Sequence, residues 1–520
     1  MDKTEATGDQ LGQKAGAAAV AAVQQDAQTT PATGPKPPAP SDRAGMLGRV
    51  TSLWRDLVGR WTEPGLDRIA PHLPDPDRDL IRQLMVDCLE GKGGDVSARA
   101  RAVALGQAYV TLDATGRHRF LGLLAEDFAA NHKAVAQAAA EMVAAHEAGD
   151  SGQVALAEAA LRRSLKAPRQ HLLRQFNALP DGVKFLVEMR SEVMDGLRQD
   201  RSLAGVDRDL KNLLKDWFDV GFLELKRITW ASPAAFLEKV ISYEAVHAIQ
   251  SWTDLKNRLD RDRRLYAFVH PRMPDEPLIF VEVALVSGMA DSVSVLLDQT
   301  APVIDPQTAD TAVFYSISNC QEGLRGITLG NFLIKTVVEQ LRSVFPGLKT
   351  YCTLSPVPGF RSWLSQRLAE GDRDLLLPGE RKALKALGDG GPKGVLRQYA
   401  EDPASVFVDP THEAALKQPL MRLCARYLAV EKRPPRGDVA TQGMGSQPLD
   451  AVARFHLANG ARMERLNWAA DRSEKGLDQS FGLMINYVYA LDEIEKNHEA
   501  FQEEGKVVCG NAFQKLVKGG

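Results

Sequence analysis

Two polar side chains in the second half of the chain lie where they could transfer protons, and the first of them is Ser355. It follows a β-like run over residues 351–354 and precedes a Pro-Val-Pro-Gly stretch. Because prolines restrict the backbone, we expect Ser355 on a stiff loop at the exit of a strand, where a polar side chain can face a cleft. The alternative is a serine that only begins a proline turn, and the local sequence by itself favours that alternative.

The second candidate is His456. Asn459 and Gly460 form a dipeptide that is typical of tight hairpin turns, so we expect strands over residues 452–457 and 461–468. Alternation along the first strand places His456 on one face with Val452 and Arg454, which is the more polar face and unlike the setting of a core histidine. A lone histidine is still more often structural than catalytic, so both interpretations remain.

A glycine-rich segment lies between a strand expected over residues 311–317 and an amphipathic helix expected over residues 329–345. Its glycines, Gly323, Gly326 and Gly330, allow the backbone to turn sharply and approach a ligand. The start of the helix offers unpaired N–H groups that suit a pyrophosphate, and Arg325 could add a charge-assisted contact. The spacing is neither a Walker loop nor the dinucleotide fingerprint, so a ligand cradle and a structural turn are equally good interpretations.

The commonest templates for hydrolases and metal sites are absent from the sequence. It has no Gly-x-Ser-x-Gly elbow, no His-Glu-x-x-His helix and no Cys-x-x-Cys pair. Cys320 and Cys352 flank the candidate residues, and buried inert thiols are the better interpretation of both. We expect neither a zinc site nor a disulfide framework, and a reducing compartment, because the cysteines are odd in number and dispersed: Cys88, Cys320, Cys352, Cys424 and Cys509.

The charge balance excludes several classes of partner. The chain of 520 residues has 64 Lys and Arg against 67 Asp and Glu, a formal net charge of −3. It lacks the global positive field that attracts nucleic acids or anionic lipids, so we expect neither as a partner. No apolar run approaches the length of a membrane span, and the first residues are acidic where a signal peptide is basic. We therefore expect a cytoplasmic protein.

The length favours two domains with tails. Residues 1–44 are rich in Ala, Gln, Gly, Thr and Pro, and they predict a disordered tail because they cannot bury enough apolar surface. Residues 46–259 carry a helical pattern, which predicts a bundle that supports or assembles rather than catalyses. The pattern is clearest in a face with helical spacing formed by Leu210, Leu213, Leu214, Trp217 and Phe218; further helices are expected over residues 102–110, 119–143, 153–165 and 186–197.

After residue 260 the pattern changes to strands that alternate with helices. Residues 266–269 and 278–283 are β-rich runs around a proline-bounded turn and predict a hairpin. The second half is therefore α+β or α/β. Two polar stretches interrupt it: residues 370–403 are charged and contain a short helical piece, and residues 432–448 have the composition of a mobile loop.

Several separated motifs resemble malonyl-CoA decarboxylase in order and spacing, as in a bacterial member of that family. The similarity runs from roughly the helical half to about residue 499. The matching segments are residues 314–318, 323–326, 329–335, 354–360, 448–460 and 482–489.

The resemblance implies a two-domain α+β protein that decarboxylates malonyl-CoA to acetyl-CoA and CO2 without a cofactor. It implies an all-α helical domain that serves oligomerisation, with a homotetramer as the expected assembly. It also implies a mixed α/β catalytic domain like that of GNAT-type N-acetyltransferases. The boundary by resemblance is near residue 215, so we adopt residues 45–215 and 216–520 rather than the change of pattern at 260.

The resemblance also carries site residues. The functional serine and histidine of the family fall on Ser355 and His456, and Ser316 and Tyr489 fall on positions proposed to line the site. The coenzyme A pyrophosphate would rest on the strand–turn–helix cradle. Animal members have a glutamate where this chain has Thr328, so no carboxylate role transfers there. The expected cradle residues are Arg325, Gly326, Ile327, Thr328, Leu329, Gly330 and Asn331.

Loss of CO2 from a malonyl thioester leaves an enolate, which the catalyst must stabilise and then protonate at carbon. We expect Ser355 to contact the malonyl carboxylate and accept a proton, and His456 to act as the general acid. The opposite division, in which His456 holds the carboxylate and Ser355 delivers the proton, stays open. Two other functions use the same cradle: an N-acyltransferase, which needs an amine acceptor, and a malonyl-CoA sensor, which binds without turnover.

Overall fold

The computed structural model describes residues 66–327, 329–372, 374–388, 390–433 and 447–518. The predicted tail over residues 1–44 and most of the predicted loop over residues 432–448 lie outside these ranges. The two ends of that loop are joined, because Lys432 and Pro448 form an isolated antiparallel bridge and the Arg433 amide donates to the Gln447 carbonyl at 2.9 Å. Among the described residues, no helix is long and apolar enough to cross a membrane.

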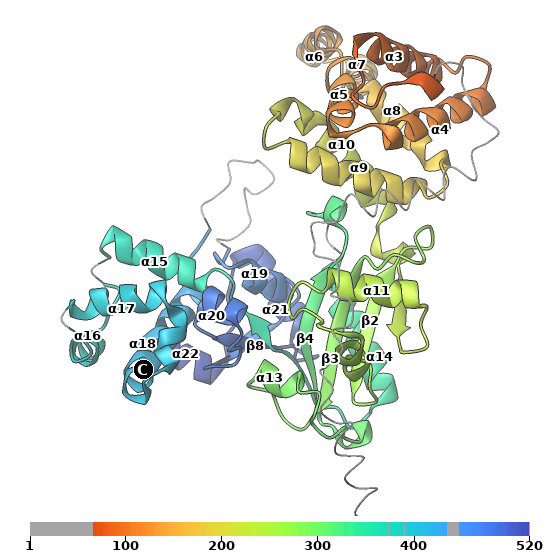
Figure 1. The fold of residues 1–520 in the computed structure, drawn as a ribbon. Coiled ribbons are helices and arrows are strands. Elements are labelled where there is room, and N and C mark those ends of the chain that lie inside the picture. The colour runs from red at the N-terminus through yellow and green to blue at the C-terminus, as the bar shows by residue number, and fades with distance from the viewer. Residues whose placement is uncertain (1–65, 328, 373, 389, 434–446, 519–520) are drawn as a thin grey trace, which may run out of the picture. The chain divides into compact units, whose positions relative to one another are not determined.

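The first described part of the chain is all helical, as the periodicity predicts (Figure 1). The predicted face of the last helix is buried at Leu210, Leu213 and Leu214. The helix expected over residues 119–143 is two helices, because the Asn131 side chain caps the second by accepting hydrogen bonds from two backbone amides. The helices are α3 (Asp75–Leu89), α4 (Asp95–Thr111), α5 (Ala114–Glu126), α6 (His132–Glu147), α7 (Ser151–Ser164), α8 (Pro168–Gln175), α9 (Gly182–Gly196) and α10 (Ala204–Trp217).

A strand interrupts the region predicted to be helical up to residue 259. Strand β1 (Glu224–Ile228) pairs antiparallel with β2 (Arg263–Val269). In the chain, α11 (Ala234–Tyr243) and α12 (Trp252–Arg258) lie between these two strands. The prediction of continuous helix is wrong here. β1 is a largely polar edge strand, and its sequence has no strong period of its own, so pairing with β2 decides its conformation.

An eight-stranded mixed sheet forms the centre of the second part (Figure 1). The predicted hairpin is confirmed as β2 and β3 (Ile279–Val286), and the predicted strand–turn–helix is confirmed as β4 (Thr311–Asn319), the 3-10 turn η7 (Glu322–Leu324) and α14 (Gly330–Val344). β4 runs antiparallel to β3 and parallel to β5 (Thr350–Thr353). The remaining strands are β6 (Ser355–Pro356), β7 (Arg462–Asn467) and β8 (Met484–Val488), and the order is β1-β2-β3-β4-β5-β8-β6 with β7 paired to β8.

Helices complete the second part, which is the predicted α+β architecture. The charged stretch over residues 370–403 contains two helices rather than one short piece. The helices are α13 (Val293–Leu296), α15 (Phe360–Glu370), α16 (Pro378–Lys385), α17 (Gly391–Glu401), α18 (Pro410–Ala429), α19 (Ala451–Ala458), α20 (Glu474–Ser480), α21 (Ile494–Glu504) and α22 (Asn511–Lys518).

The ladder between β4 and β5 is short, and this positions the site. Their parallel pairing ends at Phe314 and Thr353, after which the Leu354 amide donates to the Phe314 carbonyl at 3.0 Å. Beyond that point Ser355 pairs with Ile485 of β8 instead. The hydrogen bonding between the two parallel strands thus stops near their carboxyl ends, where their sequences become polar. This is the end of the strands at which ligands usually bind in such folds.

The turn after β4 packs directly against the helical part. The Arg190 guanidinium of α9, which is 2% exposed, donates to the Gly323 carbonyl at 2.5 Å. A Cβ atom on Gly323 would lie 1.8 Å from the Val187 carbonyl oxygen, so only glycine allows this approach. The start of the glycine-rich segment is therefore held by α9.

Candidate active site

Ser355 lies at the exit of a strand, as predicted. It is the first residue of β6, separated from the end of β5 by one residue, and it is 7% exposed. The chain then turns into α15 through Gly359, where a Cβ atom would lie 2.2 Å from the Tyr427 hydroxyl oxygen. The prolines and this close contact hold the Ser355 backbone in one conformation.

The predicted hairpin strand that carries His456 is wrong, because residues 451–458 form α19. The Asp450 side chain caps this helix by accepting a hydrogen bond from the Ala453 amide at 2.8 Å. Asn459 ends the helix, and Gly460 adopts a φ of +79° with no room for a Cβ atom against the Ile494 carbonyl. The Asn-Gly pair is therefore a helix stop, for which glycine is equally typical.

His456 is also buried, which corrects the prediction that it shares a polar face. Its exposure is 2%, and its ring stacks on that of Tyr487 with centroids 4.4 Å apart. A short segment of alternating apolar residues fits a strand or a buried helix equally well. The buried residues of α19 are Ala453, His456 and Leu457, which share one face at helical spacing, so alternation gave the wrong face.

The structure brings Ser355, His456 and Tyr489 together. The Ser355 hydroxyl oxygen lies 3.0 Å from His456 Nε2, and the Tyr489 hydroxyl oxygen lies 2.8 Å from His456 Nδ1. Ser355 also donates a hydrogen bond to the Thr353 hydroxyl at 2.8 Å. This forms a continuous row of four polar side chains from β5, β6, α19 and the end of β8, of which sequence reasoning missed Thr353.

Burial makes this row electrically neutral. It lowers the pKa of His456 to about 3, so the imidazole carries no charge at neutral pH. Burial also raises the pKa of Tyr489 well above its ordinary range, which keeps its hydroxyl protonated. A neutral imidazole between two hydroxyls can accept a proton at one nitrogen and donate from the other. The arrangement can therefore relay a proton.

Ser316, which was predicted to line the site, is hydrogen-bonded to Glu244 rather than to Ser355 or His456. Its hydroxyl lies 2.8 Å from both carboxylate oxygens of Glu244, a 7% exposed residue that the sequence analysis missed. Glu244 also accepts hydrogen bonds from the Ser318 hydroxyl and from two backbone amides of its own turn. Ser316 is thus held by a buried, well-satisfied carboxylate.

A second cluster of buried charged side chains anchors the chain segment that follows Glu244 to the sheet. Arg258 of α12 donates to the Asp254 carboxylate at 2.8 Å, to the His247 carbonyl at 2.8 Å and to Glu282 of β3 at 3.2 Å. Glu282 is fully buried; burial raises its pKa to about 8 and the charge of Glu244 adds to the shift, while Arg258 opposes it. No sequence motif marks this cluster, because its members come from separate elements.

The glycine-rich segment has the strand–turn–helix form expected of a cradle. Arg325 and Gly326 are exposed, and Gly326 has a φ of +79° that favours glycine. Ile327 is half-buried and Leu329 is buried, so these two support the turn from within. Thr328 lies outside the described residues, and α14 begins at Gly330 and Asn331.

A basic side chain of the helical part reaches this cradle. Nζ of Lys211, on α10, lies 3.3 Å from the position that a Cβ atom would take on Gly326. Lys211 forms no ion pair within the described part of the chain. Together with Arg325 it makes the rim of the cradle positive, a feature that the sequence could not indicate because α10 is more than one hundred residues away.

The five cysteines are free, and burial makes those near the site inert, as predicted. Burial raises the pKa of Cys352 to about 12 and that of Cys320 well above its ordinary range. Among the described residues, no group of His, Cys, Asp and Glu side chains is arranged to hold a metal ion.

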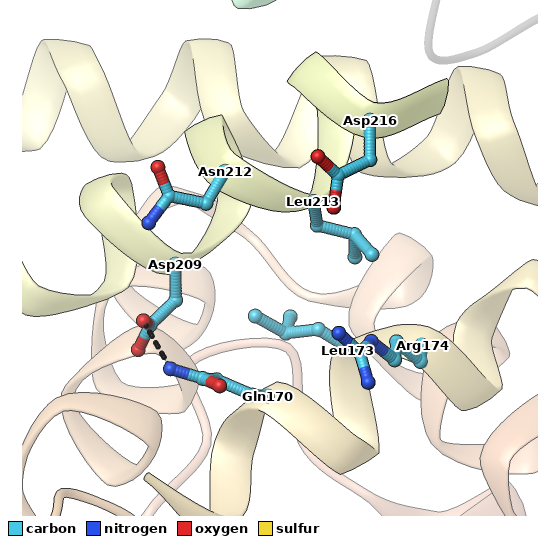
Figure 2. Close-up of a pocket in the computed structure, with 7 residues that line it drawn as sticks. All are labelled: Gln170, Leu173, Arg174, Asp209, Asn212, Leu213 and Asp216. Atoms are coloured by element: carbon cyan, nitrogen blue, oxygen red, sulfur yellow. Dashed lines mark hydrogen bonds between the residues drawn. The ribbon is translucent and has the colours of Figure 1, made fainter. Parts of the chain in front are cut away.

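Two cavities found elsewhere do not border these residues. One, of about 80 Å³, lies between α8 and α10, and two of its lining residues are joined by a hydrogen bond of 2.7 Å from Gln170 to Asp209 (Figure 2). The other, of about 430 Å³, lies between α16 and α17 and is lined by Leu376, Arg381 and Lys393, among others. Neither brings together a base, an acid and a ligand cradle.

Comparison with known proteins identifies relatives for nearly the whole described chain. The family model of the malonyl-CoA decarboxylase C-terminal domain matches residues 221–520, and that of the N-terminal domain matches residues 128–218. Mitochondrial malonyl-CoA decarboxylase of the goose Anser anser anser is 37% identical over 420 residues, 78% of this chain and 80% of that protein. The Mus musculus protein of the same name is 34% identical over 495 residues, with coverage of 93% and 94%.

A solved structure agrees with these relatives. The crystal structure of malonyl-CoA decarboxylase from Rhodopseudomonas palustris is 41% identical in sequence and superposes with a TM-score of 0.73. The match covers 84% of this chain and 99% of that one. The arrangement of helical part and mixed sheet is therefore shared along almost the full length of that protein.

Proposed function

This chain belongs to the malonyl-CoA decarboxylase family, and we propose that Ser355 and His456 transfer the proton in its decarboxylation of malonyl-CoA to acetyl-CoA and CO2. The observation that carries the assignment is the 3.0 Å contact between the Ser355 hydroxyl and His456 Nε2. These residues come from β6 and α19, 101 positions apart in the chain, so their contact is specific to the fold.

The reaction requires charge stabilisation at oxygen and a proton at carbon. The bond between the α-carbon and the carboxylate breaks, its electron pair moves through the α-carbon to the thioester oxygen, and CO2 leaves. The resulting enolate is neutralised when its α-carbon takes a proton, and one proton from solvent is consumed overall. The thioester is itself the electron sink, so the protein must supply donors to its oxygen and a proton source.

The row of neutral side chains suits this task. Ser355 accepts the hydrogen bond of the relay, and His456 donates the proton to the α-carbon as general acid. Tyr489 passes its proton to Nδ1 at the same time, so the imidazole changes from one neutral tautomer to the other and a phenolate is left on Tyr489. Nδ1 returns that proton to the phenolate when Nε2 takes up the one proton from solvent, and the high pKa of Tyr489 favours this return. Burial supports this assignment, because it excludes water that would compete for the enolate.

The cradle of β4, η7 and α14 binds the coenzyme A part of the substrate. The supporting features are the open start of α14, the left-handed Gly326 and the positive rim formed by Arg325 and Lys211. The residues assigned to this binding are Arg325, Gly326, Ile327, Thr328, Leu329, Gly330 and Asn331, with Ser316 and Tyr489 toward the malonyl end. Lys211 joins this set from the helical part.

Residues 45–215 form an oligomerisation domain that assembles a homotetramer in the cytoplasm. In the described α6 and α7, only Ala138 is buried, and Leu156 is 66% exposed. A helical hairpin with so little buried surface needs a partner to cover its apolar face. Light scattering of a Leu156→Asp variant tests this, with dissociation expected and an unchanged mass as the contrary result.

The proposal for the catalytic pair is tested with Ser355→Ala and His456→Gln. Each variant is incubated with malonyl-CoA, acetyl-CoA and CO2 are followed together, and coenzyme A binding is measured by calorimetry. We expect kcat to fall by about 10²–10⁴-fold with binding of coenzyme A little changed. Near-normal turnover in both variants would sink the assignment, and turnover that appears only with an added amine would instead indicate acyl transfer.

A further inference from the structure

We propose that Thr353 is a positioning residue that fixes the direction of the hydrogen bonds in this row and thereby keeps His456 as the tautomer with hydrogen on Nε2. The inference rests on the proposed roles of Ser355 and His456, and it adds the residue that sets the direction of their hydrogen bond. It assigns Thr353 no contact with substrate.

Thr353 is held on both sides. It is the last residue of β5, it is fully buried, and its carbonyl accepts a hydrogen bond from the Asn486 side chain at 2.8 Å. Its hydroxyl oxygen accepts from the Tyr487 amide at 3.2 Å and from the Ser355 hydroxyl at 2.8 Å. The backbone amide can only donate, so the Thr353 oxygen is an acceptor in a fixed place.

Counting hydrogens gives the direction of the row. The Ser355 hydroxyl has one hydrogen, and the geometry gives it to Thr353. The 3.0 Å contact between Ser355 and His456 Nε2 must then be donated by the imidazole. A neutral imidazole has hydrogen on one nitrogen only, so Nδ1 has a lone pair and accepts from the Tyr489 hydroxyl.

This direction matches the proposed chemistry. A general acid must carry its hydrogen on the nitrogen that faces the reacting group, which is Nε2. Without the Thr353 acceptor, the Ser355 hydrogen would turn to Nε2, and the imidazole would carry its hydrogen on Nδ1. His456 would then face the site as an acceptor, and the proton would have to be moved before it could be delivered.

The experiment measures the tautomer directly. Protein labelled with ¹⁵N-histidine is studied by NMR, and the His456 signals are assigned by their loss in His456→Gln. We expect the Nε2–H tautomer in the wild type and in Thr353→Ser, and the Nδ1–H tautomer in Thr353→Val. In parallel we expect kcat to fall at least about tenfold in Thr353→Val with KM within about twofold, and Thr353→Ser to restore most of it.

A matched control is Thr350→Val, at the opposite end of the same strand and half-buried, which should change neither tautomer nor kcat. The Nδ1–H tautomer in the wild type would overturn the proposal, and so would an unchanged tautomer with unchanged kcat in Thr353→Val. Even if Thr353→Val does not fold, the tautomers of the wild type and of Thr353→Ser still test the proposal. Failure of the catalytic pair is distinct, because it appears as normal turnover in Ser355→Ala.

Discussion

His456 and Tyr489 are joined by a 2.8 Å contact between Nδ1 and the phenol oxygen, and both side chains are buried. This contact gives the imidazole a partner on the side away from Ser355. The catalytic proposal therefore depends on a tyrosine as much as on the serine and histidine.

Tyr489→Phe keeps the ring and removes this partner. We expect kcat to fall about tenfold to a hundredfold with KM nearly unchanged, because Nδ1 can no longer be reprotonated in step with proton donation. Steady-state kinetics measure this. Tyr487→Phe is the comparison, since within the described residues the Tyr487 hydroxyl has no hydrogen-bond partner and its ring still stacks on His456. Equal losses in both variants would contradict the role of Tyr489.

The low pKa of His456 predicts a dependence of stability on pH. Its folded-state pKa of about 3 lies below the ordinary value of 6.5, so only the unfolded chain takes up a proton as pH falls between these values. The free energy of unfolding of the wild type should therefore fall relative to His456→Gln, by about 2 kcal/mol between pH 7.5 and pH 5. Urea denaturation of both proteins at the two pH values measures the difference. A constant difference would show that His456 is protonated in the fold.

The contact between Gly323 and α9 predicts a large effect of one methyl group. Gly323→Ala places a Cβ atom 1.8 Å from the Val187 carbonyl oxygen, so the turn or α9 must move. We expect the free energy of unfolding to fall by about 1–3 kcal/mol or more and KM for malonyl-CoA to rise. Gly122→Ala is the control, because no atom lies within 4 Å of its Cβ position inside α5, and it should stabilise by up to about 1 kcal/mol.

The position of Lys211 predicts that the helical part contributes to coenzyme A binding. Lys211→Ala should raise KM for malonyl-CoA about tenfold or more with a small change in kcat, because a charged contact to phosphate is lost. The effect should shrink at high salt. Lys215→Ala, which removes an exposed lysine one turn further along α10, should leave KM unchanged. An equal rise of KM in both variants would indicate general charge attraction only.

Ser316 and Ser318 donate to the same Glu244 carboxylate. Comparing alanine variants of the two serines therefore distinguishes a structural role of Ser316 from a role in substrate binding. Alanine at either position should lower the free energy of unfolding by about 1–3 kcal/mol, because a buried carboxylate loses a donor. If Ser316 also lines the malonyl site, only Ser316→Ala should raise KM. Thermal unfolding and kinetics of the pair measure both effects. Matching KM values would leave Ser316 with a structural role alone.

The sequence alone determined the features that depend on local pattern. Helical spacing predicted the first part, β-rich runs predicted the β2–β3 hairpin, and glycine spacing predicted the turn before α14. Prolines placed Ser355 at a strand exit. Each of these rests on backbone preferences within about ten residues, and resemblance to a family then connected the separate motifs to one reaction.

Only the tertiary structure decided the site itself. His456 lies on a helix because Asp450 caps it and Gly460 ends it, whereas the same residues fit a hairpin when taken alone. Its pairing with Ser355, its neutral state and its tyrosine partner all depend on burial between elements far apart in the chain. Burial and long-range contact have no period in the sequence, so the residues that tune the site become visible only when the chain is folded.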